Sequence, residues 1–183
     1  MLQNNTWTFN QPQVRDRKSG ASNSFLRMAV ARYRHAQFRA WMGRIGARLL
    51  GRDHRLLHLG SLWANASLSG GRYAGLRSVP IHQIRGSEGR SDDFDAEFRP
   101  LKAHNRWRWV NLAAARLRGA VLPPVELIQV GDVYFVRDGH HRISVARAFG
   151  QEHIDAEVTV WDLTGPLPWE PQVPAGQVAY QVA

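Results

Sequence analysis

The most strongly patterned stretch of the chain reads Val125-Glu126-Leu127-Ile128-Gln129-Val130, then Gly131-Asp132, then Val133-Tyr134-Phe135-Val136, then Arg137-Asp138-Gly139-His140-His141-Arg142. The two β-rich runs around Gly131-Asp132 predict a hairpin with a two-residue turn that has glycine first. Asp138-Gly139 ends the second strand, and residues 143–149 predict a short helix stopped by Gly150. Residues 154–161 alternate and predict another strand. This order predicts an α+β domain with a small mixed sheet and helices.

Weaker patterns lie on the amino-terminal side of this stretch. Residues 78–84 alternate as a strand, and residues 104–118 predict a helix whose inward stripe contains Trp107, Val110 and Ala114. Phe94 and Phe98 are spaced as one helical turn. Further upstream we expect a helix from Ser24 to about Leu50, a second short helix over residues 53–65 and a loop at residues 69–71.

These patterns divide the 183 residues into four segments. We expect a disordered stretch over 1–23, an Arg-rich helical arm over 24–65, the α+β domain over 78–162 and a Pro-rich extended tail over 163–183. The chain contains no cysteine, which excludes disulfides and thiolate chemistry. It shows no signal peptide and no apolar run long enough for a membrane span, so we expect a soluble, cytoplasmic protein.

The positive charge is concentrated in the first third of the chain. The formal net charge is +9; residues 1–58 contain 11 Lys and Arg against Asp16 and Asp53, and the other residues balance. Three interpretations remain for this arm: binding to DNA or RNA phosphates, contact with an anionic membrane surface, or a helix packed on the main domain. The nucleic-acid interpretation assigns the contacts to Arg27, Arg32, Arg34, Arg39, Arg44 and Arg48.

The arm does not have a clean amphipathic pattern. Leu26, Val30, Tyr33, Trp41 and Ile45 follow helical spacing as one apolar stripe. A second set widens that stripe: Phe38, Met42 and Leu49. The sequence therefore does not say which face of the arm is buried.

Residues 138–142 have the composition of a phosphate-binding loop. A glycine turn before a helix presents free backbone amides, which attract anions together with the helix dipole. Arg142, expected to point outward, and the two histidines add donors, and Asp138 could cap the helix, orient a histidine or help bind Mg²⁺. An ordinary strand–turn–helix with exposed charges fits the same residues, and both interpretations stay open. We expect no metal site formed by protein residues alone.

The order of these elements resembles the ParB/sulfiredoxin superfamily, in which a hairpin, a Gly-x-x-Arg loop, a helix and a strand follow one another. Residues 79–84, Arg90 and Phe94-Asp95 are similar to the opening strand and first box of that family. The resemblance covers roughly residues 79–161. It implies that the phosphates of a nucleotide bind Gly139, His140, His141 and Arg142, with help from Ser87 to Arg90.

Departures from the family pattern separate its branches. His140 stands where sulfiredoxins have the essential cysteine, and from the Pro-rich residues 163–183 we expect no helix-turn-helix domain of the partition-protein kind. Free serine kinases have Asp-Gly-His-x-Arg, which Asp138, Gly139, His140 and Arg142 match. By that resemblance the catalytic group would contain Glu88, Asp138 and His140, with Glu88 as the base.

The sequence thus leaves three classes of function. The first is a ParB-like protein that binds CTP, ATP or ADP with Mg²⁺ and associates with nucleic acid, as a monomer or a homodimer. The second is a phosphotransferase or nucleotide hydrolase, and the third is a degenerate interaction module. Whether the protein is an enzyme stays open at this point.

Overall fold

A mixed sheet forms the centre of the protein, which the computed structural model describes for residues 19–51, 54–62, 67–164 and 169. Within these residues the sheet has six strands, in the spatial order β1, β3, β5, β4, β6 and β2. Pairing is parallel for β1–β3, β3–β5 and β4–β6, and antiparallel for β4–β5 and β2–β6. The strand bounds are β1 Leu57–His58, β2 Ser67–Pro80, β3 Ile84–Ser87, β4 Val125–Val130, β5 Val133–Asp138 and β6 His153–Thr164.

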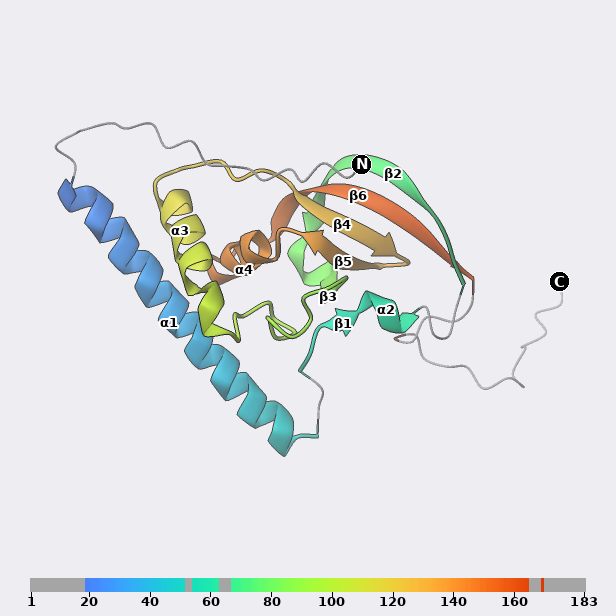
Figure 1. Ribbon diagram of the computed structural model, residues 1–183, viewed down its shortest axis with the longest axis horizontal. Helices are drawn as coiled ribbons and strands as arrows, with labels where there is room; N and C mark the ends of the chain where they lie inside the picture. The colour runs from blue at the N-terminus through green and yellow to red at the C-terminus, as the bar shows by residue number, and fades with distance from the viewer. Residues whose placement is uncertain (1–18, 52–53, 63–66, 165–168, 170–183) are drawn as a thin grey trace, which may run out of the picture.

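Three of the helices gather on one side of this sheet, as Figure 1 shows: α1 (Ser19–Leu49), α3 (Arg106–Leu117) and α4 (His140–Ala148). A single turn, α2 (Leu59–Leu62), follows β1. The fold is therefore α+β with a mixed sheet, as the sequence predicts.

Apolar side chains fill both faces of the sheet. On the α4 side, Ile143 and Ala146 pack with Phe94, Phe98 and strand residues such as Val136. On the other face, Leu59 and Leu62 of α2 cover strand residues of β4 and β5. A third cluster joins α1, α3 and α4 and contains Ala29, Tyr33, Trp109, Val110, Ala113, Ala114 and Val145.

The hairpin and the elements after it are confirmed. Gly131 has a φ of +59°, which a two-residue turn with glycine first requires. The helix begins earlier than expected, at His140 rather than Ile143, because the chain turns into α4 directly at Gly139. Residues 106–117 form α3 as predicted, preceded by a 3₁₀ turn at Ala103–Asn105.

Four local predictions are wrong. Residues 53–65 contain β1 and α2 instead of one helix, and the expected loop at 69–71 belongs to β2, where it pairs with β6 across a register shift. The strand expected over 78–84 ends at Pro80, and a 3₁₀ turn separates it from β3. Phe94 and Phe98 flank a tight turn instead of a helical one, and Phe98 has a φ of +55°.

The expected arm is a packed helix over much of its length. Tyr33 is buried and meets Trp109 of α3 edge-on, with ring centroids 5.5 Å apart. The inward residue of α3 is thus Trp109 and not Trp107, which is exposed. Of the disordered stretch expected over residues 1–23, residues 19–23 are instead the first residues of α1, and residues 1–18 lie outside the described residues. Of the tail expected over residues 163–183, residues 163–164 instead end β6, where they pair with β2, and nearly all the others lie outside the described residues. Trp169 is described, and its indole N–H donates to Asp132 at 3.3 Å.

Candidate phosphate-binding site

Gly139 joins β5 to α4 in a conformation that other residues rarely adopt. Its φ is +97°, and a Cβ at this position would lie 2.5 Å from a methyl carbon of Val125. The glycine is the N-cap of α4 and offers no side chain to the first-turn amides, and no side chain of the described residues caps them. The first turn also contains no acidic residue. The amino end of α4 therefore keeps its positive dipole and its donors for another acceptor.

A second loop lies beside this helix end because β3 and β5 are parallel. Ser87 is in register with Val136, so both strands reach the same edge of the sheet. The Ser87 hydroxyl accepts the amides of Gly89 (3.3 Å) and Arg90 (2.9 Å) and lies 2.8 Å from Nε2 of His140. With both lone pairs used, the hydroxyl donates its hydrogen to Nε2. This bond fixes the loop of residues 87–90 against the start of α4.

The two histidines are buried and neutral. Burial, reinforced by the nearby Arg90 cation, lowers the pKa of His140 to about 4. Burial and the cations of Arg90 and Arg108 lower the pKa of His141 to about 4 as well. Phe94 stacks on the His140 ring at 5.9 Å and meets the His141 ring edge-on at 5.3 Å. Nε2 of His141 is buried and has no hydrogen-bond partner among the described residues.

Arg142 does not point outward, which corrects the expectation from the sequence. Its side chain is only 14% exposed and donates to the carboxylate of Asp138, as well as to the carbonyls of Pro123 and Pro124. The guanidinium thus holds the segment before β4 against the loop. Asp138 forms an ion pair with Arg142 and, within the part of the chain that the structure describes, makes no hydrogen bond to either histidine ring.

Two ion pairs of charged side chains lie at this edge of the sheet. Glu88, 42% exposed, lies 3.3 Å from Nε of Arg137, which continues β5. Arg90 forms an ion pair with Asp93 at 3.3 Å, and its side chain is 39% exposed. The structure therefore brings Ser87, Glu88 and Arg90 close to residues 138–142, the group of site residues suggested by the sequence. Sequence reasoning missed Arg137 and Arg108, although Arg137 directly precedes the loop.

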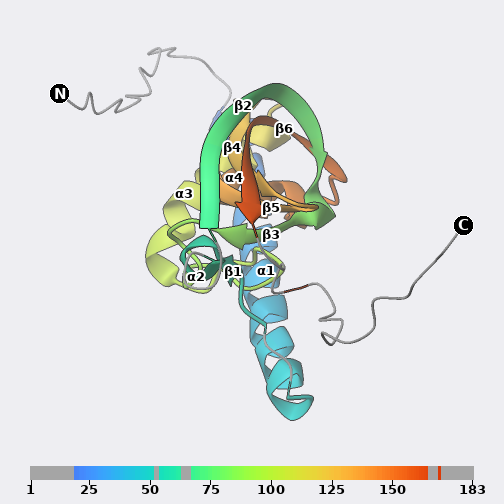
Figure 2. The ribbon, with the colours of Figure 1, turned by 90° about the vertical axis from the view of Figure 1, so that its right-hand side faces the viewer.

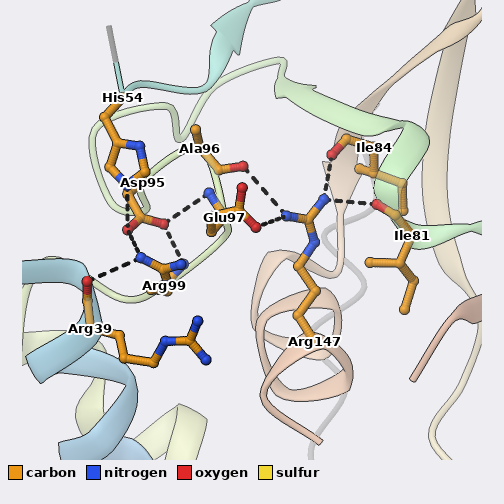
Figure 3. Close-up of polar contacts among 9 residues, drawn as sticks. All are labelled: Arg39, His54, Ile81, Ile84, Asp95, Ala96, Glu97, Arg99 and Arg147. Atoms are coloured by element: carbon orange, nitrogen blue, oxygen red, sulfur yellow. Dashed lines mark hydrogen bonds and ion pairs between the residues drawn. The ribbon is translucent and has the colours of Figure 1, made fainter. Parts of the chain in front are cut away.

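Asp95, the acidic residue of the expected Phe-Asp box, points away from this site. Its carboxylate accepts the amides of Glu97 and Arg99 and lies 3.4 Å from His54 and 3.7 Å from Arg99. Arg99 in turn donates to the carbonyl of Arg39 in α1, as Figure 3 shows. Asp95 therefore supports the attachment of α1, while its neighbour Phe94 supports the histidines.

The opposite end of α4 borders an open cleft of about 1260 Å³ that is lined by many arginines. Most of them already have partners. Arg147 donates to the carbonyls of Ile81 (2.8 Å) and Ile84 (3.0 Å) and to Glu97 (3.2 Å), as Figure 3 shows. Its guanidinium also lies over the Phe98 ring. Arg32 donates to the Ala148 carbonyl and lies over the Phe149 ring. These cations complement the negative end of the α4 dipole.

The arginines assigned to nucleic acid therefore fall into two groups. The side chain of Arg32 is engaged with α4, whereas Arg39 is tied to Arg99 only through its backbone carbonyl and its side chain is exposed. The side chains of the others are exposed and have no partner among the described residues: Arg27, Arg34, Arg44 and Arg48.

Comparisons with known proteins give little further information. No protein-family model and no curated protein sequence matches the chain. Among solved structures, the chain is similar to sulfiredoxin from Arabidopsis thaliana over 48% of this chain and 86% of that chain, with 17% identity and a TM-score of 0.37. A similarity at that level supports no statement about activity. No helix within the described residues is long and apolar enough to cross a membrane.

Proposed function

We propose that this protein is a nucleotide-binding protein of the ParB/sulfiredoxin type, which holds the phosphates of its ligand at the amino end of α4. The supporting observation is the uncapped first turn of α4 behind Gly139, with the loop of residues 87–90 fixed beside it by the bond between Ser87 and His140. A phosphate there would accept backbone amides from the helix and lie along its dipole.

The charges around the site support an anionic ligand. The amino end of a helix carries a partial positive charge, which repels nearby cations. An anion bound between the helix end and these cations is attracted to both. Arg90 lies close enough to both histidines to lower their pKa values, and Arg137 and Arg108 lie on the same side. Among the described residues, Arg137 pairs only with the exposed carboxylate of Glu88, and Arg90 pairs with Asp93, which Lys102 also binds. Both guanidinium groups are partly exposed, so a phosphate can compete for them.

The carboxylates at this edge do not form a good site for Mg²⁺. Asp138 is paired with Arg142, Glu88 with Arg137, and Asp93 with Lys102 and Arg90. A magnesium ion that accompanies a nucleotide would be held mainly by phosphate oxygens and water, as it is in many such sites.

The test is calorimetric titration of the full chain with CTP, ATP, ADP and GTP, with and without Mg²⁺. At least one nucleotide should bind, and Arg90→Ala should lower the affinity for it at least tenfold through the loss of a charge-assisted contact. Arg85→Ala is the matched control, because Arg85 is also exposed and lies on β3 but lines the cleft at the other end of α4. Absence of binding at millimolar nucleotide, or equal losses in both variants, would contradict the proposal.

A second candidate, phosphotransfer to a small hydroxyl compound, rests on the position of Glu88. It directly follows Ser87 at the end of β3 and is exposed beside the proposed phosphate site. The terminal phosphoryl group would move from the nucleotide to the hydroxyl oxygen, and Glu88 would take the hydroxyl proton. Labelled nucleotide in the same preparation tests this step: Glu88→Gln should abolish transfer while nucleotide affinity stays within about twofold. Binding without transfer would favour the first candidate.

Association with nucleic acid is the other part of the proposal. Arg27 and Arg34 support it, since both are exposed on the first half of α1, a helix that contains no acidic residue. Such contacts would be salt-dependent and weakly selective for sequence.

A further inference from the structure

The second half of α1 exposes a continuous stripe of large apolar side chains, here called the α1 stripe. Exposure runs from 39% for Ile45 to 82% for Leu49. The spacing of three and four residues places all members on one face of the helix. The stripe consists of Phe38, Trp41, Met42, Ile45 and Leu49, and the rings of its first two members lie 6.0 Å apart. A surface of this kind marks a binding interface more often than chance.

The helix cannot rotate about its axis to bury this stripe against the rest of the protein. The opposite face is made of small residues, with Ala36 and Ala40 buried against the molecule. A Cβ on Gly43 would lie 2.7 Å from Nε2 of His54, so the helix lies too close there for any larger residue. Arg99 additionally bonds the carbonyl of Arg39 (Figure 3). The packing of the small face therefore fixes the outward direction of the α1 stripe.

The stripe also lies at an extremity of the molecule. Figures 1 and 2 both show the carboxyl-terminal half of α1 projecting beyond the sheet and the other helices. The exposed surface is thus a convex ridge on a projecting helix. A ridge at such a position can approach a flat surface without collision with the rest of the described residues.

Charge limits what can cover the ridge. Arg39 borders the stripe on one side, and Arg44 and Arg48 border it on the other; α1 contains no acidic residue. A second copy paired along this ridge would bring arginines against arginines. Nucleic acid would satisfy the arginines but would leave aliphatic side chains such as Met42 and Leu49 without an apolar environment. An anionic bilayer accepts both, because the apolar face enters the acyl boundary while arginines reach the headgroups.

We propose that the α1 stripe is a membrane-surface anchor that binds bilayers containing anionic lipids. The anchor goes beyond the proposed nucleotide function, since no residue at the amino end of α4 takes part in it. The helix would lie in the plane of the interface, with Phe38 and Trp41 at the depth that aromatic side chains favour.

The experiment uses the absence of native cysteine in the full chain. Ile45→Cys and, as a matched control, Leu76→Cys place an environment-sensitive fluorophore on the stripe or on an exposed apolar position of β2, where Leu76 is 63% exposed. Vesicles of phosphatidylcholine with phosphatidylserine should shift the emission of the Ile45 probe to the blue and leave the Leu76 probe unchanged. Vesicles of phosphatidylcholine alone should give at least tenfold weaker binding.

Cosedimentation of unlabelled variants provides the second measurement. The double variant Trp41→Ser and Ile45→Ser should lose at least tenfold in partitioning to the anionic vesicles, whereas Tyr73→Ser with Leu76→Ser should match the wild type. Failure of the wild type to bind anionic vesicles would overturn the proposal. So would equal loss in the two double variants, or a dimer in sedimentation velocity that the Trp41→Ser and Ile45→Ser variant dissolves, which would assign the stripe to self-association.

Discussion

Arginines surround both ends of α4, but they are used differently at each end. At the carboxyl end, Arg147 and Arg32 donate to main-chain carbonyls and stack on aromatic rings. At the amino end, Arg90 and Arg137 pair only with the carboxylates of Asp93 and Glu88 among the described residues, while the first-turn amides have no side-chain cap. Cations at the carboxyl end complement the dipole; cations at the amino end do not. An arginine cluster therefore indicates a binding site only where its donors are not already used by the fold.

The buried histidines at the amino end should produce the largest effect. Both have pKa values lowered from 6.5 to about 4, so below pH 6.5 the unfolded chain binds protons that the folded chain does not. Stability should therefore fall as the pH drops from 6.5 to 4, by up to about 3 kcal/mol for each histidine. Above pH 7 these two histidines should add no pH dependence to the free energy of unfolding. Urea denaturation across this range measures the effect.

A substitution tests whether these histidines cause the loss of stability at low pH. His141→Phe should reduce the loss of stability between pH 6.5 and 4, because a benzene ring fills the same buried place and takes no proton. His82→Gln is the control, since His82 is exposed on the 3₁₀ turn before β3. An unchanged pH dependence in His141→Phe would show that the pKa of His141 is the same in the folded and the unfolded protein, and so is not lowered by burial.

At the carboxyl end, the structural role of Arg147 should give the next largest effect. Arg147→Ala removes donors from the carbonyls of Ile81 and Ile84 and packing from Phe98. We expect a loss of about 2–3 kcal/mol in the free energy of unfolding at pH 7. Arg85→Ala, in the same cleft but exposed, should change it by less than about 0.5 kcal/mol. Similar losses of unfolding free energy in the two variants would mean that the hydrogen bonds of Arg147 do not stabilise the fold.

Local chemistry explains which parts of the fold could be predicted from the sequence. The hairpin, α4 and β6 follow from turn glycines and alternation, which neighbouring residues determine. The Ser69-Gly70-Gly71 segment resembles a loop locally and becomes a strand only because β6, distant in the sequence, pairs with it. Tertiary pairing overrides local propensity in such a place.

The same reasoning applies to individual side chains at the candidate site. Gly139 and the loop composition could be found from the sequence, because a left-handed turn before a helix has a local signature. The inward direction of Arg142 could not, since its acceptors Pro123 and Pro124 belong to a segment well before it. Likewise, the partners of the buried Trp109 are distant in the sequence: Tyr33 of α1 packs on its ring, and Ser144 of α4 accepts its indole hydrogen at 2.8 Å.

The smallest expected effect separates the two groups of arginines on α1. Arg32→Ala should cost about 1 kcal/mol of stability through the lost bond to the Ala148 carbonyl, and it should leave nucleic-acid affinity within about twofold. Arg34→Ala should instead leave the stability unchanged and weaken nucleic-acid binding. Arg34 lies two positions from Arg32, is exposed and has no partner among the described residues. Its loss should reduce the slope of log affinity against log salt by about 1. Thermal unfolding and a salt series of mobility shifts on one duplex measure both quantities. Equal changes in the two variants would show that α1 binds nucleic acid as a general cationic surface. If the wild type gives no mobility shift at low salt, nucleic-acid binding is not part of the function, and the proposed nucleotide site is unaffected by that result.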